Sequence, residues 1–254
     1  MSTISIIDDA PRVYTEVFQI KSYHVDVHRR LTLSKLCSFF QDIAGNHTIA
    51  CGVGWELLQQ ANIFWVLSRL KIEVNKFPEW RDEISIRTWS NGLDGLMAIR
   101  HFQVLNAKGD ELVKAISSWV TVNTETRRLV RADDYMRDFP LNHVRLFAQN
   151  PDKLLAPDQG DVLNVTPVQY TEVDMNRHTN NVSYIDRIIN TYDFNFLMEH
   201  RIKNFEINFQ KEALPGDVLG VKQQKIAPLQ FLNSIVRQPD DFEMIRTFIE
   251  WEKY

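Results

Sequence analysis

The chain contains two copies of one pattern of residues, and this internal repeat limits the fold more than any other feature of the sequence. Residues 23–36 align with residues 171–184 at an offset of 148 positions. The alignment pairs Asp26 with Asp174, His28 with Asn176, Arg29 with Arg177, and Leu36 with Tyr184. In both copies a helical pattern follows, and long strands with alternating side chains come after it. This organisation predicts two similar domains in tandem.

Apolar side chains at helical spacing mark one helix in each copy. In the first copy they are Leu36, Phe39, Phe40, Ile43 and His47. Ser34 is the expected cap of this helix, and Gly52 and Gly54 are its expected end. In the second copy the corresponding residues are Tyr184, Ile185, Ile188, Ile189 and Tyr192.

Alternating apolar and polar side chains predict an antiparallel meander after each helix. The expected strands cover residues 66–74, 83–89, 96–107 and 111–123 in the first copy, and residues 205–209, 218–225, 230–237 and 242–254 in the second. One helix of ordinary length beside so many strands predicts an α+β fold in which each antiparallel sheet curls around a central helix.

The second copy carries a row of polar residues just before its helix. Asp174, Asn176 and His178 stand at every second position. In an extended segment such side chains point the same way, so we expect the three to act together on one substrate atom. The alternative is a polar turn that ends in an asparagine helix cap.

The repeat and this row together resemble the acyl-acyl-carrier-protein (acyl-ACP) thioesterase family, whose members are double hotdog proteins. The resemblance extends from about Thr15 to Tyr254. It rests on Asp174-x-Asn176-x-His178-x-Asn180-Asn181-x-x-Tyr184, Phe209-Gln210-Lys211-Glu212-Ala213, Gly54-Trp55-Glu56-Leu57 and Phe64-Trp65-Val66-Leu67-Ser68-Arg69. It implies two tandem hotdog domains in a bacterial-type member of the family.

The resemblance also implies an activity, namely hydrolysis of fatty acyl-ACP to free fatty acid and holo-ACP, which ends chain elongation. The family's working residues correspond to Asp174, Asn176, His178 and Glu212. Plant members have a cysteine after this glutamate, whereas this chain has Ala213, so a thiolate nucleophile at that position is excluded. We expect Glu212 to activate water, with Asp174 as either orienting group or nucleophile. No metal or other cofactor is expected.

The first copy departs from the row, because His28 replaces the asparagine and Arg30 replaces the histidine. We therefore expect residues 1–124 to form a catalytically silent domain, residues 125–160 a linker, and residues 161–254 the catalytic domain. The aromatic side chains of the silent half predict a pocket for the acyl chain. Its expected lining is Phe39, Phe40, Ile43, Trp55 and Phe64.

Three other functions remain open at this point. They are an acyl-CoA thioesterase of similar fold, a hotdog dehydratase, and a non-enzymatic acyl-binding module. A dehydratase would not need Asn176 and Glu212, and a pure binder would not need a charged row. His24-x-Asp26-x-His28 also has the spacing of metal ligands on a strand, but no companion cluster accompanies it. We interpret it as the silent counterpart of the catalytic row.

Composition limits the classes of partner and the cellular compartment that we expect for this protein. The net charge of −4 gives no support to nucleic-acid binding, which needs a concentrated basic face. The two cysteines, Cys37 and Cys51, have no metal-site spacing and fit a reducing compartment. Residues 1–10 carry acids where a leader would carry Lys or Arg, and no apolar run reaches membrane-span length. We expect a cytoplasmic protein that binds acyl-ACP, either a monomer or a homodimer.

Overall fold

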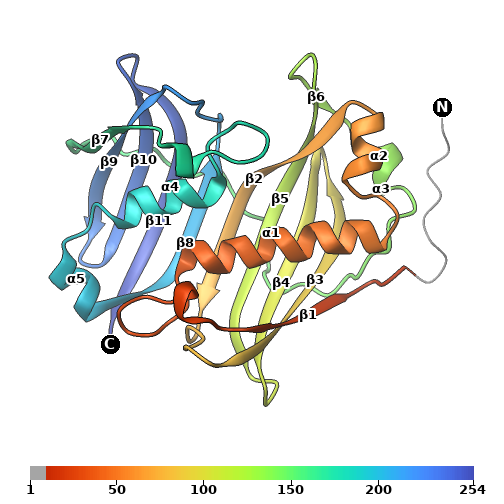
Figure 1. Cartoon of the computed structure of the whole chain (residues 1–254), viewed down its shortest axis with the longest axis horizontal. Coiled ribbons are helices and arrows are strands. Elements are labelled where there is room, and N and C mark those ends of the chain that lie inside the picture. Colours follow the sequence, from red (N-terminus) through yellow and green to blue (C-terminus); the bar gives the residue numbers. More distant parts are fainter. Residues whose placement is uncertain (1–9) are drawn as a thin grey trace. The chain divides into compact units, whose positions relative to one another are not determined.

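The computed structural model describes residues 10–254, apart from the side chains of residues 134 and 135. The chain divides into two compact units (Figure 1). The first holds most of the chain up to Pro151, and the second holds Asp152–Tyr254 together with the short segments Thr32–Cys37 and Lys71–Val74. Most of the acidic N-terminal stretch, on which the expectation of a missing leader rests, lies outside the described residues.

The first half of the chain supplies one sheet and its long helix. Its strands are β1 (Tyr14–Gln19), β2 (Ile63–Val74), β3 (Glu83–Asp94), β4 (Met97–Asn106), β5 (Glu111–Asn123) and β6 (Leu129–Val130). Its helices are α1 (Leu33–Ala50), α2 (Trp55–Gln60), α3 (Asp133–Met136) and the short 3₁₀ helix η1 (Ser22–His24). The strand order is β1-β3-β4-β5-β2, with β6 beside β5. Helix α1 packs on this sheet, since the ring of Phe40 stacks on Phe102 of β4 at 4.6 Å.

The second half repeats the same plan. Its elements are β7 (Val162–Pro167), η2 (Tyr170–Glu172), α4 (Asn181–Ile189), α5 (Phe194–Glu199), β8 (His200–Phe209), β9 (Val218–Ala227), β10 (Gln230–Gln238) and β11 (Phe242–Lys253). The strand order β7-β9-β10-β11-β8 is the order of the first half, strand for strand. The paired strands are antiparallel. The predicted repeat and its antiparallel meanders are therefore confirmed.

The elements differ from the prediction in several details. Strand β3 continues to Asp94 through a register shift between Ser90 and Gly92, whereas the expected strand ended at Trp89. Helix α1 begins at Leu33, so Ser34 lies inside it and is not its cap. The Thr32 hydroxyl accepts a hydrogen bond from the Lys35 N–H at 3.3 Å, which is the contact that an N-terminal cap makes.

The segment expected as a linker packs closely against the first unit. It contains β6 and α3, and as far as Pro151 it clusters with that unit. Phe139 is buried with Cys51 and Val53, and Phe147 is buried with Ile99 and Ile116. The boundaries at residues 124 and 160 stay a prediction. In residues 10–254 no helix has the length and apolar character to cross a membrane.

Candidate active site

The polar row lies on a tight turn, so the prediction of an extended segment was wrong. One oxygen of the Asp174 carboxylate accepts hydrogen bonds from the backbone N–H groups of Asn176 and His178, at 2.8 and 3.1 Å. Arg177 between them has a positive φ of 64°. An aspartate that binds its own backbone offers the chain an alternative to the strand ladder, and this local bonding overrides the alternating pattern.

The first half contains the same turn. The Asp26 carboxylate accepts hydrogen bonds from the N–H groups of His28 and Arg30, at 2.8 and 2.9 Å. Arg29 has a φ of 62°, as its counterpart in the second half does. The aspartate thus builds the turn in both halves, including the half in which the other row residues are replaced.

Glu212 lies beside the imidazole of His178. The distance between Glu212 Oε2 and His178 Nε2 is 3.5 Å, and both side chains are partly exposed. Glu212 belongs to the irregular segment between β8 and β9. Thr179 anchors this segment, because its N–H donates to the Ala213 carbonyl at 2.9 Å. A carboxylate next to an imidazole is a pair suited to moving a proton.

The structure brings the four expected catalytic residues together. Asn176 is exposed, and its side-chain nitrogen lies 3.5 Å from Asp174. Asp174 contacts the backbone of His178, whereas Glu212 contacts the ring. Of these two carboxylates, Glu212 is the one that lies beside the imidazole ring. Helix α4 follows directly, and its start is confirmed because the Asn180 side chain accepts from Val182 N–H at 3.2 Å.

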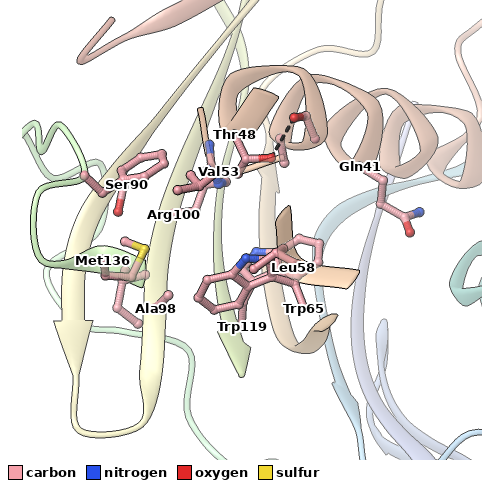
Figure 2. A pocket seen from close by; sticks show the side chains of 14 residues that line it. Gln41, Thr48, Val53, Leu58, Trp65, Ser90, Ala98, Arg100, Trp119 and Met136 are labelled. Carbon is pink, nitrogen blue, oxygen red and sulfur yellow. Dashed lines mark hydrogen bonds between the residues drawn. The ribbon is translucent and has the colours of Figure 1, made fainter. Parts of the chain in front are cut away.

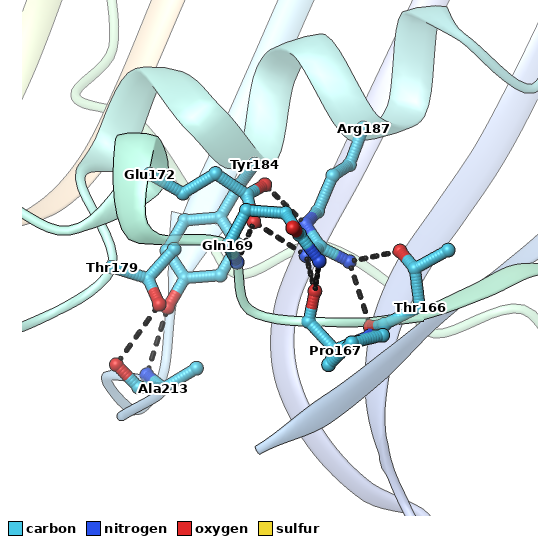
Figure 3. A network of polar contacts seen from close by, with 8 residues as sticks. All are labelled: Thr166, Pro167, Gln169, Glu172, Thr179, Tyr184, Arg187 and Ala213. Carbon is cyan, nitrogen blue, oxygen red and sulfur yellow. Dashed lines mark hydrogen bonds and ion pairs between the residues drawn. The ribbon is translucent and has the colours of Figure 1, made fainter. Parts of the chain in front are cut away.

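A partly buried ion pair lies next to the end of the strand that precedes the turn. The guanidinium of Arg187 on α4 donates to both carboxylate oxygens of Glu172 at 2.6 Å. It also donates to the hydroxyl of Thr166 and to the carbonyls of Thr166 and Pro167 (Figure 3). Burial raises the pKa of Glu172, but the hydrogen bonds from Arg187 and from the Gln169 N–H, together with the charge of Arg187, outweigh this effect and lower the pKa. No motif in the sequence singles out Arg187.

A pocket opens in the first unit, with a cavity volume of about 140 Å³ (Figure 2). It is lined by Gln41, Ala44, Gly45, Thr48, Val53, Leu58, Trp65, Ser90, Ala98, Ile99, Arg100, Trp119, Met136 and Phe139. Arg100 is buried, and its Nη1 donates to His47 Nδ1 at 2.9 Å and to the Thr88 hydroxyl at 3.2 Å. The guanidinium is thereby held in place, and burial lowers its pKa to about 10.

None of the five residues expected around an acyl pocket is among those that line this cavity. Phe39, Phe40 and Ile43 are buried in the core, where Phe39 stacks on Phe18 at 4.6 Å. Trp55 is 52% exposed, and the Arg127 guanidinium lies 5.2 Å from the ring of Phe64. Their role in substrate binding stays a prediction.

Comparison with known proteins now identifies the family. The family models described as the acyl-ACP thioesterase N-terminal domain and C-terminal domain match residues 11–139 and 156–253. The chain belongs to the acyl-ACP thioesterase family. Family membership agrees with the repeated turn, in which one copy keeps the Asp-x-Asn-x-His row and the other does not.

Curated relatives in the acyl-ACP thioesterase family come from plants. The chain is 28% identical to an oleoyl-ACP thioesterase of Arabidopsis thaliana over 227 residues. This alignment covers 81% of this chain and 61% of that protein. It is 28% identical over 224 residues to a palmitoyl-ACP thioesterase of Gossypium hirsutum, covering 82% of this chain and 54% of the relative. The chain thus spans only about half to three fifths of the length of these relatives.

Solved structures of the family share the fold over nearly the whole chain. An acyl-ACP thioesterase from Bacteroides thetaiotaomicron matches with a TM-score of 0.88 and 25% identity, covering 95% of this chain and 98% of that one. A 12:0-ACP thioesterase from Umbellularia californica matches with a TM-score of 0.83 and 22% identity, covering 96% and 98%. These matches confirm the predicted α+β fold of two tandem hotdog domains.

Within residues 10–254, as far as their side chains are described, no three His, Cys, Asp or Glu residues are grouped so as to hold a metal ion. The row His24, Asp26 and His28 forms part of the η1 helix and the turn that follows it.

Proposed function

We propose that the protein hydrolyses the thioester of a fatty acyl-ACP and releases a free fatty acid and holo-ACP. The observation that carries this proposal is the contact between Glu212 and the His178 imidazole, next to the turn that presents Asn176. The oleoyl- and palmitoyl-ACP thioesterases among the relatives support it. The partner is then an acyl carrier protein that bears the acyl group.

The contacts support a route that uses water. Glu212 takes a proton from water as the water oxygen adds to the thioester carbonyl carbon. The carbon–sulfur bond then breaks, and the proton passes from Glu212 through His178 to the departing sulfur. Asn176 is exposed on the same turn and supplies an amide donor to the oxyanion. The products are a carboxylic acid and a thiol, so atoms and charge balance.

In this proposal Asp174 shapes the turn and is not the nucleophile. One of its oxygens is occupied by two backbone N–H groups, and Asp26 makes the same two bonds in the half that lacks the row. A residue that serves both halves equally has a role that both halves share. That role is the geometry of the turn.

We assign the acyl tail to the pocket of the first unit. The lining is mostly apolar, with Leu58, Trp65, Trp119 and Phe139 among its members. A cavity of about 140 Å³ is close to the ~150 Å³ that accommodates benzene, so it has room for roughly six carbon atoms. It therefore takes one end of a fatty chain. In this proposal the first unit determines which acyl-chain length is preferred, and the second unit hydrolyses the thioester.

Two other functions are alternatives to the proposed one, and the cysteines bear on the compartment in which the protein acts. An acyl-CoA thioesterase would use the same residues on a different carrier, and an acyl-binding module would bind without hydrolysis. The buried, unpaired thiols of Cys37 and Cys51 support action in a reducing compartment such as the cytoplasm. Monomer and homodimer both remain compatible with the proposal.

One experiment tests the reaction and the carrier together. The purified protein is incubated with acyl-ACPs and acyl-CoAs of graded chain length, and the released fatty acids are identified by mass spectrometry. We expect release from acyl-ACP, and a fall of at least about a hundredfold in the His178→Ala and Glu212→Gln variants. Arg30→Ala, at the first-half counterpart of His178, is the matched control and should retain the rate. Release of fatty acid from acyl-CoA but not from acyl-ACP would show that the carrier is coenzyme A. Binding of acyl-ACP without release of fatty acid would overturn the proposal that the protein is an enzyme.

The same panel tests the pocket. Ala98→Leu fills space beside the cavity, so the product profile should move toward shorter fatty acids while hydrolysis persists. Ala107→Leu adds the same side chain at an exposed position and serves as the control. An unchanged profile in folded Ala98→Leu would place the tail elsewhere.

A further inference from the structure

A cluster of buried hydroxyl groups lies directly behind Glu212. The Tyr184 hydroxyl, on α4, accepts a hydrogen bond from the Ala213 N–H at 2.8 Å. The Thr179 hydroxyl donates to the Ala213 carbonyl at 3.1 Å, alongside the Thr179 N–H (Figure 3). Tyr184 is 2% exposed, Thr179 is 3% exposed and Ala213 is fully buried. Water therefore cannot replace these bonds.

Two buried side chains hold the peptide groups on either side of Ala213. The Tyr184 hydroxyl binds the N–H of Ala213, and the Thr179 hydroxyl binds its carbonyl oxygen. The aromatic ring packs against Phe209 at the end of β8, with 6.3 Å between centroids, which fixes the position of the hydroxyl. Both peptide groups of Ala213 are thus held from one side.

The first half shows what this segment looks like without a catalytic carboxylate. Asn75 and Lys76 N–H groups both donate to the Leu112 carbonyl, and Leu31 N–H donates to Pro78. In the second half the N–H groups of Gln210 and Lys211 both donate to Met244, and Thr179 donates to Ala213. These matching bonds pair Phe77 with Glu212 and Pro78 with Ala213.

The differences between the halves occur together. Pro78 has no N–H, and the helix position that corresponds to Tyr184 is Leu36, which has no hydroxyl. The Tyr184 hydroxyl therefore occurs in the half that also has the Ala213 N–H, which it binds, and the Glu212 carboxylate, which precedes that N–H. A requirement of the fold alone would apply to both halves, since both contain the same segment.

We propose that Tyr184, together with Thr179, is a positioning residue that holds the Ala213 peptide and so sets the Glu212 carboxylate against His178. This proposal rests on the proposed function, in which Glu212 is the base. Burial, with a smaller contribution from the charge of Glu212, raises the pKa of Tyr184 to about 12, so the hydroxyl stays protonated at neutral pH. It acts on Glu212 only through the peptide that follows it.

The test is a double-mutant cycle between Tyr184→Phe and Glu212→Gln. Rates are measured with whichever acyl-ACP of the panel the wild-type protein hydrolyses fastest. We expect Tyr184→Phe to lower kcat roughly ten- to hundredfold with KM nearly unchanged, since small displacements of a reacting group have costs of that size. In the Glu212→Gln background Tyr184→Phe should have no further effect on the residual rate. Tyr192→Phe removes another buried hydroxyl of the same unit and should leave kcat unchanged.

Each outcome decides a different point. A kcat of Tyr184→Phe within twofold of wild type overturns the proposal, and so does an equal fall in both backgrounds, which means that Tyr184 acts independently of Glu212. Full activity of Glu212→Gln instead overturns the proposed function. If circular dichroism shows that Tyr184→Phe is unfolded, Thr179→Val takes its place in the cycle. A fall confined to the background that contains Glu212 then supports the proposal, and an unchanged kcat overturns it.

Discussion

Asp174 and Asp26 occupy equivalent places in the two halves. Their shared contacts show which interactions of Asp174 belong to the backbone turn and do not depend on a reaction. Each carboxylate accepts two backbone N–H bonds across a turn that contains one residue with positive φ. These bonds stabilise a conformation that an arginine adopts only at some cost. A charged row in a sequence can therefore include residues that shape the backbone as well as residues that react.

Replacing Asp174 by asparagine tests this assignment. The Asn side-chain oxygen can still accept both N–H bonds, so Asp174→Asn should retain kcat within about tenfold, while Asp174→Ala should lose about a hundredfold or more. Asp26→Asn and Asp26→Ala are matched controls that report on the turn by itself. Steady-state rates and urea unfolding curves are the measurements. If Asp174→Asn is folded and as inactive as Asp174→Ala, the nucleophilic route is correct.

At the residue scale the motif predicted which residues lie together but not how they contact one another. Asp174, Asn176, His178 and Glu212 do come together, although Glu212 is distant in sequence from the other three. Tyr184 belongs to the same motif, yet nothing in the sequence indicates that its hydroxyl meets Ala213. A hydrogen bond between a helix and a loop depends on tertiary packing, which no local spacing encodes.

At the scale of elements, the strands of the two meanders were predicted, whereas β1, β6 and β7 were not. None of the five residues expected around an acyl pocket lines the cavity of the first unit. Strand β5 has the predicted bounds, because its alternation begins and ends at clear polar turns. The pocket was sought among large aromatic residues, but large side chains fill space. The signal that marks it is a face of α1 with side chains that leave room, at positions 41, 44, 45 and 48.

The ion pair between Arg187 on α4 and Glu172 on η2 has a testable energetic role. Arg187→Met leaves the partly buried Glu172 carboxylate without its partner, so we expect the free energy of unfolding to fall by about 3–5 kcal/mol. The double variant Glu172→Gln/Arg187→Met removes both charges and should recover part of this loss. Lys76→Met breaks the exposed pair with Glu79 and should cost about 1 kcal/mol or less. Urea unfolding checks all three, and an equal loss in the single and double variants would contradict the expectation.

At the scale of the whole molecule, the two halves keep one strand order and one turn but differ in their buried polar groups. The first unit buries Arg100, His47 and His101. Both ring nitrogens of His101 are buried and have no hydrogen-bond partner among the described residues, and its ring stacks on Trp89 at 5.7 Å. The first unit therefore contains histidines that must stay neutral for the fold to persist.

This requirement predicts that acid weakens the first unit. Burial lowers the pKa of both His47 and His101 from 6.5 to about 4, with Arg100 adding to the effect on His47 and Arg145 to that on His101. Between pH 6.5 and about 4 the unfolded chain binds these two protons and the folded chain does not, so stability falls as the pH is lowered through this range. From pH 7 to pH 5 we expect a loss of about 2 kcal/mol for each histidine.

His101→Phe isolates half of this effect, because phenylalanine keeps the stacking on Trp89 and removes the titrating group. Urea unfolding of wild type and variant at pH 7 and pH 5 should show a pH-dependent loss that is smaller by about 2 kcal/mol in His101→Phe. His143→Gln, at an exposed histidine, is the control and should follow the wild type. An identical loss in wild type and His101→Phe would mean that His101 does not contribute to the acid sensitivity. The cause would then lie with His47. Glu172 is not a candidate, because its lowered pKa places its loss of stability below this pH range.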